Sequence, residues 1–191
     1  STCQRTFIYR RTSVANTNPS PLEATIILGT PRQGRVSEQV AQHLKSLLVA
    51  RGAHVNFVDV RTFDFPHDDY GGALKNKFPE YTNIVLKTDA FFIVSPEYNH
   101  GYPGSLKMVL DLLLPEYRHK AVGVIGVSSG QWGGVRMVEN LLPVLRELGL
   151  VAARTTLNVP NGDTAFTPEG TPVDPKFDER ANKLIDDVFW L

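Results

Sequence analysis

Four residues that could do acid–base chemistry or bind a polar ligand stand side by side in the stretch "SPEYNHGYPGSLK" at 95–107: Glu97, Tyr98, Asn99 and His100. The stretch separates two apolar runs, so it could be a catalytic cluster, a ligand-binding surface or only a turn between core segments. A hydrolytic triad is not indicated, because no Ser, Cys or Asp stands out as a partner for the histidine. Four adjacent side chains cannot all point inward from so short a loop, so several of these residues must offer backbone amides instead.

A second polar stretch, "GTPRQGRVS" at 29–37, follows an apolar run. It spaces two glycines as a Walker A loop does, but an arginine and a valine stand where the lysine and the hydroxyl residue belong, so we exclude an NTPase. It also lacks the G-x-G-x-x-G of dinucleotide-binding folds. Its hydroxyls, its guanidinium groups and the amino end of a following helix suit a single terminal phosphate, although an ordinary turn with solvated arginines is the alternative. The residues expected at this phosphate are Thr30, Arg32, Arg35 and Ser37.

The loop that contains the quartet suits a flat heterocycle. Pro96 should end the preceding strand and fix the backbone, and Gly101 permits close approach of a ligand. A third stretch, "SSGQWGG" at 128–134, offers an opposing wall, with small residues for close approach and Trp132 for stacking. Each of these residues also has a structural explanation when taken alone, such as a cap, a core residue or a surface histidine. Their common placement after apolar runs favours a ligand site.

The elements that must position these loops alternate along the chain. Such alternation builds a parallel sheet with right-handed crossovers, and ligands then bind beyond the carboxyl ends of the strands. The expected strands are 24–28, 54–60, 90–95, 121–128 and 150–159, and the expected helices are 37–52, 80–89, 105–114, 135–149 and 176–190. Ser37 is expected to cap the first helix, Gly52 to end it, and Pro143 to lie inside the fourth.

The overall composition limits the classes of protein to which this chain can belong. The 191 residues suit one domain, and 20 Lys and Arg balance 20 Asp and Glu, which argues against a nucleic-acid or anionic-membrane partner. One cysteine excludes an intrachain disulfide and a cysteine-based metal centre, and it fits the cytoplasm. No apolar stretch approaches the roughly 18 residues of a membrane span. Residues 1–22 are polar and are expected to form a flexible arm before a single domain at 23–191.

The three loop stretches together resemble those of the NADPH-dependent FMN reductase family, which includes flavodoxin-like quinone, azo and chromate reductases. The resemblance covers about residues 24–160. It implies an α/β, flavodoxin-like three-layer sandwich with a five-stranded parallel sheet of order 2-1-3-4-5 and FMN at the switch point. The residues expected to bind this cofactor are Thr30, Arg32, Arg35, Ser37, Pro96, Glu97, Tyr98, Asn99, His100, Gly101, Ser128, Ser129 and Gly130, with no catalytic side chain and no metal.

The resemblance also implies an activity. Hydride would pass from NADPH or NADH through bound FMN to a quinone, azo compound, free flavin or metal ion by a ping-pong mechanism. It further implies a homodimer or homotetramer, in which Lys107 and Asp111 either serve an interface or pair within their helix. The alternatives are a flavodoxin-type electron carrier and a flavin-gated interaction protein without turnover. Arginines in the first loop and a net charge of zero argue against the flavodoxin.

Overall fold

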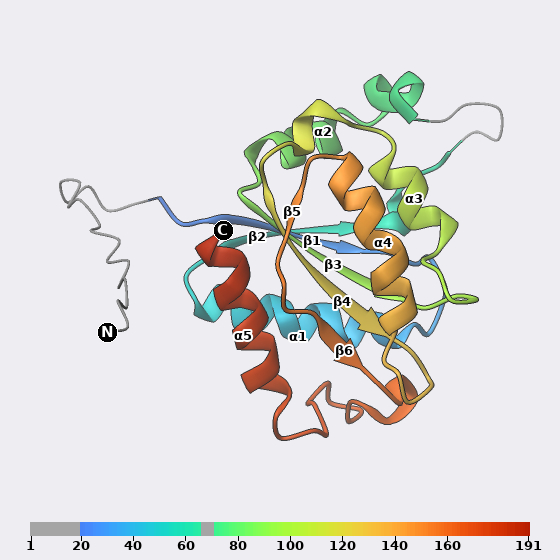
Figure 1. Ribbon diagram of the computed structural model, residues 1–191, viewed down its shortest axis with the longest axis vertical. Coiled ribbons are helices and arrows are strands. Elements are labelled where there is room, and N and C mark those ends of the chain that lie inside the picture. Colours follow the sequence, from blue (N-terminus) through green and yellow to red (C-terminus); the bar gives the residue numbers. More distant parts are fainter. Residues whose placement is uncertain (1–19, 66–70) are drawn as a thin grey trace, which may run out of the picture.

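The chain forms a parallel sheet covered by helices on both faces (Figure 1). This computed structural model describes residues 20–65 and 71–191, so most of the expected N-terminal arm lies outside the described residues. The strands are β1 (Glu23–Leu28), β2 (His54–Asp59), β3 (Ala90–Pro96), β4 (Ala121–Val127), β5 (Val151–Ala152) and β6 (Leu157–Val159). The α-helices are α1 (Val36–Ala50), α2 (Pro79–Lys87), α3 (Gly104–Leu110), α4 (Val135–Glu147) and α5 (Phe177–Trp190).

The strand order is β2-β1-β3-β4-β5, with every strand pair parallel, which confirms the predicted flavodoxin-like sheet. The chain first steps outward from β1 to β2 and then returns to the other side of β1 to form β3. The direction of winding therefore reverses between β1 and β3, at the place where ligands bind in such sheets. The loops that leave these two strands are the first and second of the polar loops singled out in the sequence.

Two hydrophobic cores sandwich the sheet. β3 and β4 are buried along their length because their residues are apolar on both faces, as in a sheet covered on two sides. On one face α1 and α5 pack through Leu44 and Leu184, and on the other face α2, α3 and α4 pack through Val85, Leu106 and Leu141. Each such buried aliphatic side chain stabilises the fold by roughly 1.5–3 kcal/mol. The strands and helices that flank the loops are therefore held rigidly in place.

The expected continuous strand at 150–159 is wrong, because the structure divides it. β5 pairs with the first two residues of β4, and β6 pairs with the last three. Between them the Thr155 hydroxyl donates a hydrogen bond to Asp187 of α5, and the Thr156 hydroxyl donates to Asn158 at 3.0 Å. These side-chain bonds draw the chain out of the ladder, as a bulge does at the edge of a sheet.

The start of α1 also differs from the expectation. The residue at its N-cap is Arg35, which makes no side-chain capping bond, and Ser37 lies buried within the first turn. The helix thus begins two residues earlier than a serine cap would require. At the other end Gly52 has φ of +80°, which confirms its expected role in ending the helix. Pro143 lies inside α4, as expected.

Candidate functional site

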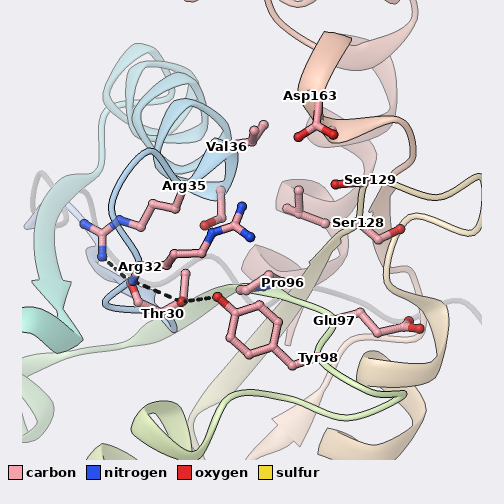
Figure 2. Close-up of a pocket in the computed structure, with 13 residues that line it drawn as sticks. Thr30, Arg32, Arg35, Val36, Pro96, Glu97, Tyr98, Ser128, Ser129 and Asp163 are labelled. Carbon is pink, nitrogen blue, oxygen red and sulfur yellow. Dashed lines mark hydrogen bonds between the residues drawn. The ribbon is translucent and has the colours of Figure 1, made fainter.

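A pocket of about 60 Å³ lies beyond the carboxyl ends of β1, β3 and β4 (Figure 2). It brings together most of the residues predicted for the cofactor, from all three loops. Its lining is Thr30, Arg32, Arg35, Val36, Ser37, Pro96, Glu97, Tyr98, Val127, Ser128, Ser129, Gly162 and Asp163. Asn99, His100, Gly101 and Gly130 were also predicted for the cofactor but do not line it, and Val36, Val127, Gly162 and Asp163 were not predicted.

The first loop offers hydrogen-bond donors to an anion. The first N–H groups of a helix have no carbonyl four residues back within it, and α1 has no side-chain cap to take their place, although the N–H of Glu38 reaches the Arg35 carbonyl at 3.2 Å. Within the described parts of the chain, the hydroxyl oxygen of Ser37 is the one buried side-chain nitrogen or oxygen without a hydrogen-bond partner. An unpartnered buried hydroxyl costs about 1–3 kcal/mol. An acceptor such as a phosphate oxygen would remove that cost.

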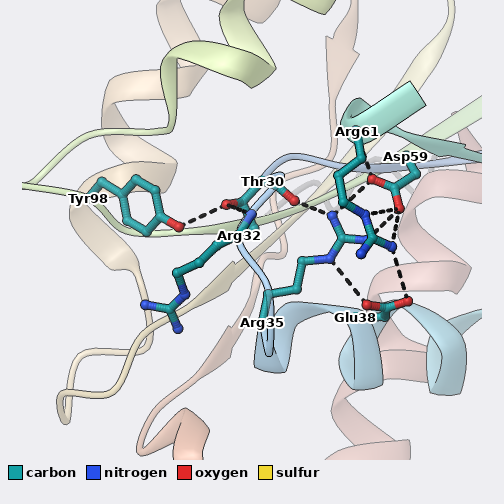
Figure 3. Close-up of polar contacts among 7 residues, drawn as sticks. All are labelled: Thr30, Arg32, Arg35, Glu38, Asp59, Arg61 and Tyr98. Carbon is teal, nitrogen blue, oxygen red and sulfur yellow. Dashed lines mark hydrogen bonds and ion pairs between the residues drawn. The ribbon is translucent and has the colours of Figure 1, made fainter. Parts of the chain in front are cut away.

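The two arginines of the first loop point in opposite directions (Figure 3). Arg32 is exposed and extends toward the pocket, where its guanidinium makes no ion pair with any described residue. The side chain of Arg35 is only 1% exposed, and its guanidinium donates to the carbonyl of Thr30 and to both carboxylate oxygens of Asp59. Arg32 is therefore the cation that the loop presents to a ligand, and direct contact of the Arg35 guanidinium with a ligand stays a prediction.

Asp59, at the end of β2, is held by two arginines. It accepts both bonds from Arg35 and three more from Arg61, from the backbone N–H at 3.0 Å and the side chain at 3.0 and 2.8 Å. Burial alone would raise the pKa of this carboxyl, but the hydrogen bonds from Arg35 and Arg61 outweigh it and lower the pKa to about 2. The carboxylate is thus charged at any pH at which the protein would work.

The second loop is a tight turn whose tip faces away from the pocket. The backbones of Tyr98 and Gly101 exchange hydrogen bonds of 2.8 and 2.9 Å, and the two residues between them, Asn99 and His100, have φ of +49° and +66°. Asn and His are among the side chains that tolerate this region best. The turn leaves only its first half at the pocket, where the hydroxyls of Tyr98 and Thr30 are hydrogen-bonded at 2.8 Å.

Glu97 caps α4. Its carboxylate accepts the backbone N–H groups of Arg136 and Met137 at 3.2 and 3.4 Å and pairs with the Arg136 guanidinium at 3.4 Å. A carboxylate at the amino end of a helix is favoured by the helix dipole. A second tether runs from the Asn140 amide to the carbonyl of His100 at 2.7 Å. The second loop is therefore fastened to α4 at its start and at its tip, and the charge of Glu97 is directed at the helix.

The third loop is shaped by close backbone packing. Gly133 and Gly134 have φ of +58° and +80°, and a Cβ on Gly133 would lie 2.8 Å from the backbone nitrogen of Val159. Any larger residue would push β6 away from β4. Trp132, by contrast, is 57% exposed, so it is a surface residue beside the site and not part of the core.

Asp163 is the charged residue among the four lining residues that the sequence did not indicate. It follows β6 in a turn whose preceding residue, Gly162, donates its N–H to the carbonyl of Ser128 at 2.9 Å. Figure 2 shows Asp163 near Ser129, across the pocket from Thr30 and Arg32. Only its place in the sequence could have indicated Asp163, because its turn follows the carboxyl end of a strand, as the other three loops do.

Residues 20–65 and 71–191 contain no group of three His, Cys, Asp or Glu side chains that could hold a metal ion. The same residues include no helix with the length and apolar character needed to cross a bilayer.

Comparison with known proteins identifies relatives. A sequence profile described as NADPH-dependent FMN reductase matches residues 22–164. An NAD(P)H-dependent FMN reductase of Saccharomyces cerevisiae is 29% identical over 168 residues, which cover 78% of this chain and 83% of that protein. An FMN-dependent NADPH-azoreductase of Staphylococcus saprophyticus is 26% identical over 176 residues, 87% of this chain and 93% of its own. The solved structure of a flavoenzyme NAD(P)H:(acceptor) oxidoreductase from Paracoccus denitrificans has a similar fold, with a TM-score of 0.72 at 23% identity over 87% of this chain and 97% of that one.

Proposed function

We propose the activity of this chain on one premise: it belongs to the NADPH-dependent FMN reductase family, whose profile matches residues 22–164. It is therefore an FMN-dependent oxidoreductase that uses NAD(P)H. Our proposal concerns the finer steps. NADPH or NADH is oxidised first and leaves, and a quinone, azo compound, free flavin or metal ion is then reduced at the same place. The observation that supports this proposal is the pocket at the switch point. Among the described residues, the Ser37 hydroxyl there has no hydrogen-bond partner and the Arg32 guanidinium has no ion pair.

The residues present fit FMN. The pocket of about 60 Å³ beside the first loop has room for a phosphate and is lined by donors that suit one. We assign the phosphate to Thr30, Arg32, Ser37 and the first turn of α1, where backbone donors and the helix dipole add to the arginine. The rings would then lie over the second and third loops. FMN would supply the redox chemistry when bound, since it can take up and release hydride.

The chain's own residues would bind and orient. Glu97 caps α4, so we assign it to loop geometry and not to proton transfer. Backbone amides of 128–130 are our candidates for the donors that stabilise charge on the flavin. Arg32 would hold the phosphate while the rings stay accessible, and the exposed Trp132 would form one wall of the acceptor site. An open site of this kind lets one substrate leave before the next enters, as a ping-pong cycle requires.

We also propose that the protein is a homodimer or homotetramer. Lys107 and Asp111 pair within α3 at 2.7 and 2.6 Å, which favours the intrahelical alternative for these two residues. An apolar groove between the ends of α3 and α4, lined by Leu113, Leu114 and Val144 among others, is a better surface for a second copy. Light scattering of the purified protein would measure the assembly. The cytoplasmic setting stays a prediction.

The test of the activity is spectroscopic and kinetic. The FMN-loaded protein should show two flavin bands in the visible spectrum that bleach on anaerobic addition of NADPH. Addition of a quinone or an azo dye should restore them, and steady-state NADPH oxidation should give parallel double-reciprocal plots. Bands that persist in NADPH, with no turnover of either acceptor, would refute the reductase cycle and leave an electron carrier or a flavin-gated binding protein.

A further inference from the structure

We propose that Arg35 and Asp59 are positioning residues, which hold the first loop in the shape that binds the cofactor's phosphate without touching the cofactor. The inference rests on the phosphate assignment proposed above. It assigns a role to Asp59, a residue at the end of the neighbouring strand that no feature of the sequence pointed out. It also gives Arg35 the role of holding the loop from the side away from the ligand, in place of direct electrostatic attraction for the phosphate.

Arg35 reaches three separate parts of the structure (Figure 3). One of its terminal nitrogens donates to the carbonyl of Thr30, at the start of the loop, and also to Asp59 Oδ1 at 2.9 Å. The other donates to Asp59 Oδ2, at the end of β2. Nε donates to Glu38 in the first turn of α1 at 3.3 Å. A planar guanidinium joins these three groups with donors in fixed directions, whereas the donors of an ammonium group radiate from a single atom on a flexible stem.

The charges in this cluster cancel. Arg35 and Arg61 are balanced by Asp59 and Glu38, which lie within ion-pair distance of them. The cluster thus adds little net attraction for an anion, and it lies behind the loop with the Arg35 side chain almost fully buried. Attraction for the phosphate then comes from Arg32 and the helix end, whereas Arg35 acts on geometry.

The contact with Thr30 shows which part of the first loop Arg35 holds in place. Thr30 carries the hydroxyl that faces Tyr98 and the pocket, and its carbonyl is the acceptor for Arg35 on the other side of the same peptide. The other bonds of the loop gather at its first residue, because Gly29 donates its N–H to the Val94 carbonyl at 2.9 Å and accepts from the Ser105 hydroxyl at 3.2 Å. Beyond it, the backbone N–H of Arg32 reaches the Thr30 hydroxyl only at 3.4 Å. Loss of the guanidinium would remove the anchor of the Thr30–Pro31 peptide, and because the ring of Pro31 fixes its own φ, the residues that follow Thr30 would shift together with it. The donors of the phosphate site would then no longer converge.

The experiment compares FMN with riboflavin, which lacks the phosphate. Apoprotein is titrated with each flavin by fluorescence, in the wild type and in Arg35→Lys and Asp59→Asn. We expect both variants to bind FMN about tenfold more weakly, or worse, because hydrogen bonds to charged groups are lost. Riboflavin affinity should stay within about twofold. Arg61→Ala is the matched control, because it removes an Asp59 partner that does not contact the loop, and it should keep the wild-type preference for FMN.

The dependence of FMN binding on ionic strength distinguishes a positioning role from direct electrostatic attraction. Arg32→Ala removes direct attraction, so it should both weaken FMN binding and reduce its dependence on ionic strength. In the double variant Arg35→Met/Asp59→Leu, which removes one charge of each sign, the weaker FMN binding should keep the wild-type salt dependence. A salt dependence reduced as far in this variant as in Arg32→Ala would overturn the proposal, because it would make Arg35 a direct ligand.

Other outcomes are equally decisive. A wild type that binds FMN and riboflavin equally refutes the phosphate site itself. A wild type that prefers FMN, with Arg32→Ala losing the preference and the Arg35 and Asp59 variants keeping it, overturns only this inference. Equal weakening of both flavins also overturns it, because it indicates a general structural role. If a single variant fails to fold, the double variant Arg35→Met/Asp59→Leu removes both buried charges together. Loss of the FMN preference in the folded double variant supports the proposal, and retention overturns it.

Discussion

Removal of the Glu97 carboxylate tests whether the second loop does acid–base chemistry or supports a helix. In the structure its side chain is 11% exposed and accepts two backbone N–H groups of α4, at 3.2 and 3.4 Å. Loss of such a cap costs about 1 kcal/mol. The pair with Arg136, which is 45% exposed, adds at most about 0.5–1 kcal/mol. We therefore expect Glu97→Ala to lower the free energy of unfolding by about 1.5–2 kcal/mol.

The melting temperature converts this into an observable. A domain of this size loses about 2–4 °C per kcal/mol, so Glu97→Ala should melt about 3–8 °C lower than the wild type. Glu97→Gln keeps one acceptor oxygen and should lose about half as much. Asn140→Ala, which cuts the other tether of the same loop, is the control and should cost about 1 kcal/mol.

Turnover distinguishes the two roles. With saturating FMN, Glu97→Gln should keep kcat for NADPH oxidation within about threefold, since the carboxylate faces the helix. A general acid or base typically contributes 10²–10⁴-fold. A hundredfold fall in kcat with an unchanged melting temperature would refute our reasoning and restore the catalytic interpretation of the quartet.

Further predictions concern the pocket and its surroundings. Arg32→Ala should weaken FMN binding about tenfold or more at low salt, and a variant that keeps its FMN through dialysis would contradict the phosphate assignment. Asp163→Asn should tighten FMN binding a few-fold in a fluorescence titration, because it removes a negative charge from the pocket that takes the phosphate; weaker binding would make Asp163 an acceptor for a cofactor hydroxyl. Gly133→Ala should lower the urea midpoint well below that of the wild type, because its Cβ would lie 2.8 Å from a backbone nitrogen of β6. The contribution of Asp59 to stability should be constant above about pH 4, its unfolded pKa, and be lost as the pH falls toward about 2; a wild-type minus Asp59→Asn difference that instead shrinks above pH 5 would contradict this.

Much of the fold could be predicted because its signals are local. Strands β1, β3 and β4 are short apolar runs, and each helix shows its own periodicity, so the alternation and hence the parallel sheet follow from neighbouring residues. The three loops were located for the same reason, since each begins where an apolar run ends. The parallel arrangement then brings them to one edge, without any knowledge of side-chain contacts.

The parts that could not be predicted depend on partners far along the chain. The orientation of Arg35 is set by Asp59, on another strand, and the break in the fifth strand is set by Asp187 on the last helix. Ser37 matches the preferred residue type for an N-cap, but the helix starts two residues earlier, with Arg35 at the N-cap and its side chain held by Asp59. No local pattern reports such contacts, so the sequence located the loops correctly but not the direction in which their side chains point.

The divided fifth strand has a consequence for the behaviour of the protein in concentrated solution. A long, straight strand at the edge of a sheet offers unpaired backbone groups on which another chain can add a strand. Here the outer strand on the β4 side is cut into runs of two and three residues, with a side-chain-bonded bend between them. That edge is too short and too irregular to template growth into fibres. A change that straightens it, such as Thr155→Val, should therefore be watched for aggregation as well as for stability.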